Sequence, residues 1–333
     1  METVLKDQYV QKKEIGSGAY GRVYLAEDII NKKNVAIKRL KRSEIDKDEY
    51  LKKALDKEIE IMKLCHCENS VILIEDFQTT NNYNFVMELC DGDLDGELKS
   101  RKKPFTEEEL KLILRQLSNV FVIMDRENII HRDIKHKNFL VKKDPNNPNN
   151  KLGFIVKIAD FGFSKVMEND MTRSVLGTPS TMAPEVLSKS EYSKKADLWS
   201  VGVITYQLLF NSLPFNGRSQ EEILQTILKS KEIMYPNTNP ISRTLKHLIN
   251  NLLQKDPNKR YNWKEFLNHP FLGLNTEIEK INLQGQIPFA NVINPNIYIN
   301  IVLYIIHLIL LLLINSISSK INTMEQENYQ RTQ

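Results

Sequence analysis

The sequence has few cysteines and lacks a secretory signal, and both shortages indicate where the protein works. Only three of its 333 residues are cysteines, namely Cys65, Cys67 and Cys90. Such a small, odd number is typical of a reducing compartment and excludes a disulfide-stapled scaffold. Residues 1–10 contain no apolar run of the kind that directs secretion. We therefore expect a cytoplasmic protein.

Net charge is also low, and metal ligands are sparse. The chain has 46 Lys and Arg residues against 42 Asp and Glu, a surplus of +4. Dedicated nucleic-acid binders usually carry a strong basic surplus, so we expect no nucleic-acid partner. Cys65, His66 and Cys67 lie close together, but the sequence offers no second ligand pair, so a helix end near the core is the preferred interpretation.

The expected elements change character along the chain. Residues 9–40, 71–77 and 83–88 contain short apolar or alternating segments that predict strands, and residues 43–64 have helical spacing. From residue 92 onward helices dominate. This order predicts an α+β fold with two lobes, a small β-rich N-lobe with one main helix and a larger α-helical C-lobe.

Helix signals in the second part are clear. Thr106 and Glu109 form a capping-box pattern that opens a long helix ending near Glu127. Residues 144–150 are rich in Asn and Pro, which predicts a surface loop. Further helices are expected at 205–210, 221–229 and 243–253.

A glycine-rich run is the first motif with chemical content. Ile15 is followed by Gly16, Ser17, Gly18 and, after two residues, by Gly21. A GxGxxG pattern alone is weak, because it also opens dinucleotide-binding folds, in which a helix follows it. Here a strand pattern beginning at Val23 follows. A β-hairpin whose amides approach phosphates is therefore favoured, and a dinucleotide-dependent enzyme is the disfavoured alternative.

Lys38 closes the apolar strand that contains Ala36. A lysine at the end of a buried strand needs an anion, because an isolated buried charge is costly. A phosphate or a carboxylate on the following helix would serve. Glu58 is the preferred carboxylate, and Glu60 is the alternative.

Two further segments offer side-chain oxygens for catalysis or metal binding. In the run His131 to Asn138, Asp133 can accept the proton of a hydroxyl group, and Asn138 can offer a neutral oxygen to a hard metal ion. Lys135 lies between them and can face a phosphoryl group. Asp160, in the Asp-Phe-Gly run after an apolar strand, is well suited to hold Mg²⁺.

Taken in order, these motifs resemble the eukaryotic protein kinase superfamily, serine/threonine type, over residues 9–271. The Ala-Pro-Glu run ending at Glu185 and the segment starting at Asp197 extend the resemblance, as does Arg260, which in this family pairs with that glutamate. The runs at 160–165 and 182–186 resemble the autophagy-initiating and calcium/calmodulin-dependent groups.

The resemblance implies a function and roles for these residues. The expected activity is transfer of the γ-phosphate of ATP to Ser or Thr hydroxyls of protein substrates, with ATP and Mg²⁺ as cofactors. Asp133 and Lys135 would be catalytic, and Asn138 and Asp160 would hold the metal. The expected nucleotide-binding residues are Ile15, Gly16, Ser17, Gly18, Gly21, Val23, Ala36, Lys38, Glu58, Met87, Glu88, Cys90 and Leu140.

Specificity and regulation rest on fewer residues. Lys135 and the Gly177-Thr178-Pro179 run favour serine or threonine over tyrosine. Arg132 implies a phosphate on the activation loop, added by an upstream kinase or by autophosphorylation. Ser174 is the preferred site, with Thr172 and Thr178 as rivals, although Thr178 is better suited to contact the catalytic loop.

The chain departs from the family pattern at a few positions. His136 replaces a usual Pro, and Lys137 stands where basophilic members often have Glu, which disfavours Arg-directed substrates. None of these changes removes a catalytic group. A pseudokinase scaffold that acts by binding is the rival, but Lys38, Asp133 and Asp160 are all present.

The tail follows no family pattern. Residues 272–296 are expected to form a linker, residues 297–314 are almost wholly apolar, and residues 315–333 form a polar tail. As a helix the apolar segment would span roughly 27 Å, close to the hydrocarbon thickness of a bilayer. A membrane anchor, a docked helix and translated AT-rich non-coding sequence remain open.

Overall fold

The computed structural model describes residues 3–17, 21–161, 165–166, 178–188, 192–237 and 240–274. Gly18, Thr172, Ser174 and Gly177 lie outside these residues, as does the apolar segment 297–314. Among the helices that the structure does describe, none combines the length and the apolar character needed to cross a bilayer.

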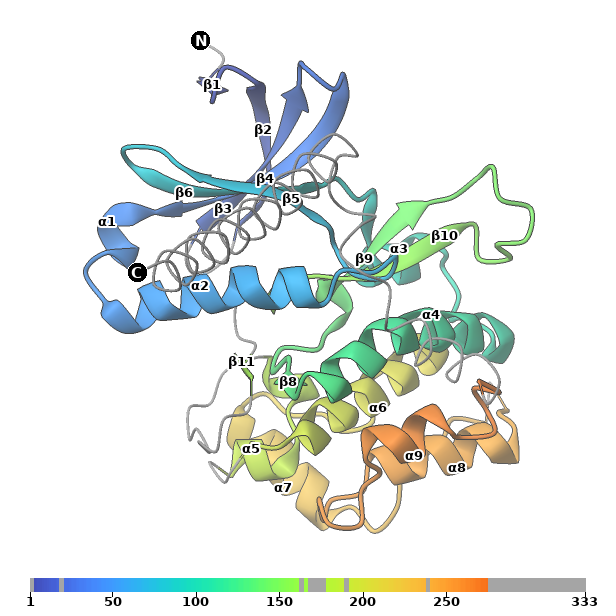
Figure 1. Ribbon diagram of the computed structural model, residues 1–333. Coiled ribbons are helices and arrows are strands. Elements are labelled where there is room, and N and C mark those ends of the chain that lie inside the picture. Colours follow the sequence, from blue (N-terminus) through green and yellow to red (C-terminus); the bar gives the residue numbers. More distant parts are fainter. Residues whose placement is uncertain are drawn as a thin grey trace, which may run out of the picture. The chain divides into compact units, whose positions relative to one another are not determined.

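A six-stranded antiparallel sheet forms the first part of the chain (Figure 1). Its order is β1-β2-β3-β4-β6-β5. The strands are β1 (Thr3–Leu5), β2 (Tyr9–Ser17), β3 (Gly21–Asp28), β4 (Lys33–Lys41), β5 (Leu73–Gln78) and β6 (Asn82–Glu88). The sequence did not predict β1. It forms because Lys6 and Asp7, at φ 54° and 52°, make a tight turn back onto β2.

The sheet is curled, so residues near one edge meet the other. The side chains of Lys6 and Tyr9 both bond to Glu75 of β5, the strand at the far end of the sheet order. Tyr9 also stacks on Phe77 at a centroid distance of 6.1 Å. These contacts enclose the apolar residues on the inner face, among them Val35 and Ile37.

Two helices, α1 (Arg42–Ile45) and α2 (Glu49–Leu64), accompany the sheet. The prediction of one helix over 43–64 was wrong at its start. Asp48 interrupts the helix because it adopts an extended conformation and its carboxylate accepts bonds from the N–H groups of Tyr50 and Leu51. Ile45 and Leu55 then pack against the sheet residues Leu40, Tyr83 and Phe85.

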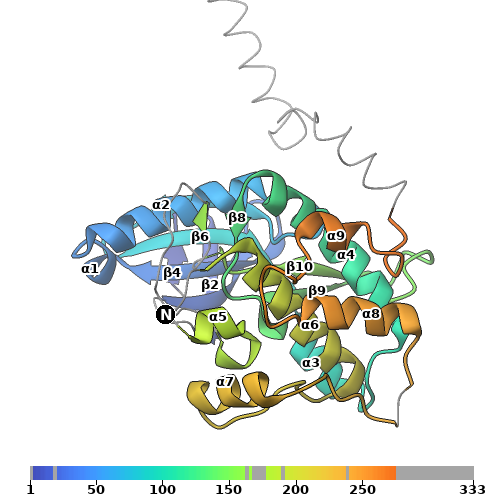
Figure 2. The ribbon, with the colours of Figure 1, turned by 90° about the horizontal axis from the view of Figure 1, so that it is seen from below.

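Helices make up most of the second part (Figures 1 and 2). They are α3 (Leu94–Ser100), α4 (Glu107–Arg126), α5 (Pro184–Leu187), α6 (Lys194–Phe210), α7 (Gln220–Lys229), α8 (Arg243–Leu252) and α9 (Trp263–Leu267). The predicted capping box of α4 is confirmed in Thr106 and Glu109. Helix α6 packs against α4 and α8 (Figure 2).

The prediction for α6 began too late, because its first helical turns are buried on nearly all sides. The helix starts at Lys194, eleven positions before the predicted start at residue 205. A helix without a polar face lacks the period on which sequence-based prediction relies. The short helix α3 was not predicted either.

Small sheets line the junction between the two parts. Strands β7 (Gly92–Asp93), β9 (Phe139–Lys143) and β10 (Phe154–Ile158) form one, and β8 (Ile129–Ile130) pairs with β11 (Lys165–Val166). The turn between β9 and β10 contains the Asn- and Pro-rich segment, and Asp144 donates its N–H to the Gly153 carbonyl at 2.9 Å. The expected surface loop is confirmed, and it connects two antiparallel strands.

A buried ion pair fastens α5 to the base of the second part. Arg260 donates to both carboxylate oxygens of Glu185, at 2.6 and 2.8 Å, as the sequence predicted. Its remaining N–H groups bond to the carbonyls of Gln254 and Lys195, both at 2.9 Å, and its guanidinium lies 5.1 Å from the Trp199 ring. The side chain of Arg260 is fully buried, so the pair is desolvated.

Replacing Arg260 with Met should destabilise the fold by about 3–5 kcal/mol, because Glu185 would remain buried without its partner. The free energy of unfolding measured in urea tests this. Arg218→Met, at an exposed arginine, is the matched control and should change stability by less than about 0.5 kcal/mol. The double variant with Glu185→Met should regain part of the loss. An unfolding midpoint for Arg260→Met equal to that of the control would contradict this account.

Candidate functional site

Four of the predicted nucleotide-binding residues lie on one face of the first sheet. Val23 of β3 lies opposite Lys38 of β4, and Ala36 lies opposite Met87 of β6. Directly opposed residues in antiparallel strands share a face, as do residues two apart in one strand. Val23, Ala36, Lys38 and Met87 therefore lie on the same side of the sheet.

The glycine-rich turn is described only in part. Gly16 pairs with Val23 in the hairpin, Ser17 is exposed, and the Ile15 side chain is 45% exposed. At Gly21 a Cβ would collide with the carbonyl oxygen of Arg39, so close packing of β3 on β4 already requires glycine there. The sequence had indicated only a phosphate-binding reason for this residue.

Lys38 joins three elements through its ammonium group. It bonds to Glu58 of α2 at 2.6 Å and to Asp160, which follows β10, at 3.2 Å. Burial opposes the charge of Lys38, but the two carboxylates outweigh it and raise the pKa of Lys38 above its ordinary value. Lys38 therefore carries its charge at neutral pH.

The choice between the two glutamates of α2 is clear in the structure. Glu58 is buried against Lys38, whereas Glu60 pairs with Lys57 at 2.9 Å and its side chain is 56% exposed. The preference for Glu58 is confirmed as a contact. Two positions along a helix differ by about 200°, so only one of the pair can face the sheet.

A buried carboxylate on α6 holds the catalytic loop. Asp197 accepts bonds from the N–H groups of His131 at 2.7 Å and Arg132 at 3.0 Å, one on each oxygen. Burial raises the pKa of Asp197, and these two bonds act in the opposite direction by favouring the ionised form. The sequence marked Asp197 as part of a family segment but gave it no role.

The loop is further shaped at Arg132, whose φ of 68° lies in the left-handed region. A non-glycine residue there is strained and persists only when its surroundings hold it. The two bonds from Asp197 supply that restraint. His131 completes the packing, because its ring lies 5.2 Å from the Phe161 ring.

Asp133 is almost fully buried and receives three side chains. Lys135 bonds to its Oδ2 at 2.5 Å, Asn138 donates to the same oxygen at 3.2 Å, and the Thr178 hydroxyl donates to Oδ1 at 3.2 Å. Asn138 also donates to the Asp133 carbonyl at 2.8 Å. The structure thus brings together the residues that the sequence proposed for catalysis, and Thr178 contacts the catalytic loop as expected.

Asn138 and Asp160 present oxygens suited to Mg²⁺. Both bonds that Asn138 makes to Asp133 come from its Nδ2, which leaves its Oδ1 available. The Asp160 side chain is 41% exposed although one oxygen meets Lys38. Burial opposes ionisation of Asp160, but Lys38 holds its pKa below the ordinary value. Two oxygen ligands suit Mg²⁺, which usually takes the rest from phosphates and water.

The segment from Glu88 to Asp91 connects the two parts. The Glu88 carboxylate bonds to Lys142 and to the buried Lys157, both at 2.8 Å, and accepts the N–H of Ile72 at 2.9 Å. Burial would raise the pKa of Glu88, but these bonds hold it below its ordinary value. Since its own N–H bonds to the Ile72 carbonyl, only the carbonyl of Glu88 remains for a nucleotide. Sequence reasoning missed this network.

The side chains of Cys90 and His136, next to the site, are neutral. Burial raises the pKa of the Cys90 thiol to about 11. Burial lowers the pKa of His136 to about 4, and its Nε2 has no partner within the described residues. At neutral pH both side chains are therefore uncharged.

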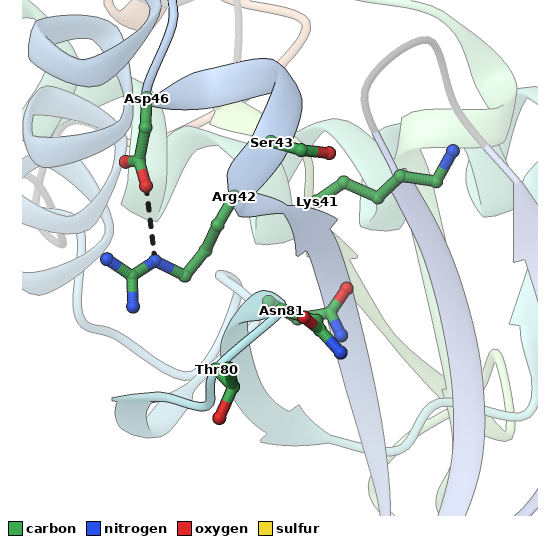
Figure 3. Close-up of a pocket in the computed structure, with 7 residues that line it drawn as sticks. Lys41, Arg42, Ser43, Asp46, Thr80 and Asn81 are labelled. Carbon is green, nitrogen blue, oxygen red and sulfur yellow. Dashed lines mark hydrogen bonds and ion pairs between the residues drawn. The ribbon is translucent and has the colours of Figure 1, made fainter.

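A separate hollow lies elsewhere on the first lobe (Figure 3). It has a volume of about 590 Å³ and is lined by residues of β4, α1 and the β5–β6 turn, including Lys41, Arg42 and Asp46. In Figure 3 the guanidinium of Arg42 faces Asp46, to which it bonds at 3.2 Å. None of the predicted site residues lines it.

Comparison with known proteins agrees with this geometry. Residues 9–272 match the protein kinase domain family. A probable myosin light chain kinase of Dictyostelium discoideum is 38% identical, with 82% of this chain and 86% of the relative aligned. Myosin light chain kinase A of the same organism is 36% identical over 84% of this chain and 93% of that protein.

A more distant relative is much longer than this chain. The human serine/threonine-protein kinase ULK1 is 33% identical over 84% of this chain but only 26% of its own length. Both groups that the sequence motifs indicated are thus represented among the relatives. The chain belongs to the protein kinase family, and it is a serine/threonine protein kinase.

Proposed function

We propose that the chain transfers the γ-phosphate of ATP to serine or threonine hydroxyls with Asp133, Lys135, Lys38, Asn138 and Asp160 in the roles that follow. The observation that carries this proposal is Lys38, held between Glu58 and Asp160 at 2.6 and 3.2 Å. That contact places a fixed positive charge beside the carboxylate proposed to hold the metal. The pseudokinase alternative gains no support, because each polar group required for transfer is present.

Asp133 would receive the substrate hydroxyl. Its carboxylate is held by Lys135, Asn138 and Thr178, so its orientation is set before a substrate arrives. It would align the hydroxyl and accept its proton as the phosphoryl group is transferred. Lys135 would place positive charge near the transferred group. Positioning and electrostatic stabilisation then provide most of the catalysis.

Asn138 and Asp160 would hold Mg²⁺, which supplies charge neutralisation between the phosphates when it is bound. Lys38 would bind the α- and β-phosphates. The adenine would lie between Val23 and Ala36 on one side and Leu140 on the other, next to Met87 and the backbone at Glu88 and Cys90. The shared face of Val23, Ala36 and Met87 supports this placement.

The substrates of a kinase of this family are proteins. The names of the relatives point to two different kinds of kinase, so they indicate no single substrate for this chain. We propose that the protein acts in the cytoplasm. We propose residues 297–314 as a candidate membrane tether. Release of the full-length protein from membranes by alkaline extraction would contradict that tether.

Replacing Glu58 with Gln should lower kcat/KM for ATP by about 10- to 100-fold, since a charged hydrogen bond contributes about 1.5–3 kcal/mol. Lys38 would lose the partner that fixes its position. Glu60→Gln is the matched control on the same helix and should stay within twofold of the wild type. Initial rates at varied Mg-ATP test this, and equal effects of the two substitutions would refute the role of Glu58.

Replacing Asp133 with Asn should reduce kcat about 10²- to 10⁴-fold, the usual contribution of a positioned general base. Since Asp133 does not touch the nucleotide in this proposal, the Kd for Mg-ATP should change little. Phosphate transfer to a serine peptide and nucleotide binding by calorimetry measure the two effects. Asp76→Asn, at an exposed ion pair with Lys63, serves as control. A wild-type rate for Asp133→Asn would exclude it as the base.

Ser174 is proposed as the activating phosphorylation site, and its phosphate would bind Arg132. A phosphate there would add charge-assisted bonds that order the loop. We expect Ser174→Ala to lower kcat at least about tenfold, with Thr172→Ala much closer to wild type. Assays after treatment with Mg-ATP, with mass spectrometry of the loop, measure this. Full activity of Ser174→Ala would eliminate the proposal.

A further inference from the structure

Lys137 differs from the other charged residues of the catalytic loop because its ammonium group has no ion-pair partner within the described ranges. It is exposed on the 3₁₀ turn η1 (His136–Asn138). By contrast, Lys135 is bound to Asp133 at 2.5 Å. A solvated lysine is ordinary on a protein surface, so the meaning of Lys137 depends on its position.

That position is fixed relative to Asp133. Asn138 closes the turn through its N–H bond to the Lys135 carbonyl at 3.0 Å and its side-chain bond to the Asp133 carbonyl at 2.8 Å. Because the Asn138 side chain reaches the Asp133 carbonyl, the backbone of the adjacent Lys137 lies within roughly 12 Å of Asp133. An extended peptide advances about 3.3 Å per residue. A substrate that places its hydroxyl on Asp133 therefore has side chains within reach of Lys137, about three residues away or nearer.

Three acidic side chains near this turn are already engaged. Helix α3 contacts η1. Asp93, the N-cap of α3, accepts the N–H of Gly96 at 2.7 Å, and Asp95 on α3 pairs with Lys99 at 2.7 Å. Asp91 accepts the N–H of Lys143 at 2.8 Å. Within the described residues no carboxylate is bound to Lys137, so its ammonium group can meet a substrate.

The described residues of the other wall next to Asp133 carry no charge. The turn η3 (Pro179–Thr181) follows Thr178, which bonds to Asp133, and contains only Pro, Ser and Thr. It offers no carboxylate that would attract a basic substrate residue.

We propose that Lys137 makes this kinase prefer substrates with an anionic side chain, a carboxylate or a phosphate, within about three residues of the acceptor hydroxyl. This inference rests on the proposed function, since Asp133 must be the residue that receives the hydroxyl. Exposed ion pairs are weak, so the selectivity is several-fold for a carboxylate. A phosphate, with nearly two negative charges, gives a larger effect.

The test uses one serine peptide in which each of the three residues on either side is changed to Asp, phosphoserine, Ala or Arg. Values of kcat/KM are measured for the wild type, for Lys137→Glu and for Lys151→Glu. The last variant makes the same change of charge at an exposed position in the β9–β10 turn. Thermal melting confirms that all three proteins are folded.

At the best position the wild type should favour Asp over Arg about five- to tenfold, and phosphoserine more strongly. Lys137→Glu should reverse this order, and Lys151→Glu should keep it. Improvement by phosphoserine but not by Asp would identify previously phosphorylated proteins as the substrates. A wild-type preference for Arg, or an unchanged preference in Lys137→Glu, would overturn the inference. If no peptide is phosphorylated by the wild type, the proposed function itself fails.

Discussion

The fully buried carboxylate of Asp197 is the constraint from which the rest of the site follows. A charge without solvent is costly, and here the cost is offset by two backbone N–H groups of the loop that begins at His131. Because each oxygen takes one N–H, the loop has a fixed orientation on α6. The left-handed conformation of Arg132 is held in this way, and the next residue, Asp133, is directed into the site.

Hydrogen bonds and ion pairs connect the groups around Asp133 and Asp160. Asn138 ties the end of the loop to its middle, and its free oxygen lies on the side left open by those bonds. Asp160 brings the second oxygen and at the same time pairs with Lys38, which reaches α2 through Glu58. A shift of α2 would therefore move Lys38 relative to Asp160. The catalytic arrangement depends on packing in both lobes and not on one segment.

Sequence reasoning succeeded where chemistry is local and failed where it depends on tertiary packing. The spacing of the motifs identified Lys38, Asp133, Asn138 and Asp160, which the structure brings into two connected groups. Glu58 could be favoured over Glu60 because its distance along the chain from the strand at Val71 fits better. The side-chain role of Glu88 could not be predicted, since its lysine partners, Lys142 and Lys157, lie on strands more than fifty residues away.

The fold shows the same division. The break between α1 and α2 depends on one capping aspartate, and the full extent of α6 was hidden because burial on all sides removes the amphipathic period. Strand β1 was missed because it has only three residues and is stabilised by contacts far along the chain. In each case the sequence shows the residues of the element but not the tertiary contacts that decide where it begins and ends.

The contacts of Lys6 and Tyr9 with Glu75 also affect how the protein behaves in solution. An open sheet presents unpaired N–H and C=O groups along its edges, and such edges recruit strands from other molecules. Because the sheet is curled, the opposite charges of Lys6 and Glu75 lie where its two edges approach each other. Charged side chains near an edge disfavour pairing with a strand of another molecule. Charges at this edge thus act against strand pairing between molecules, an effect that does not involve the catalytic residues.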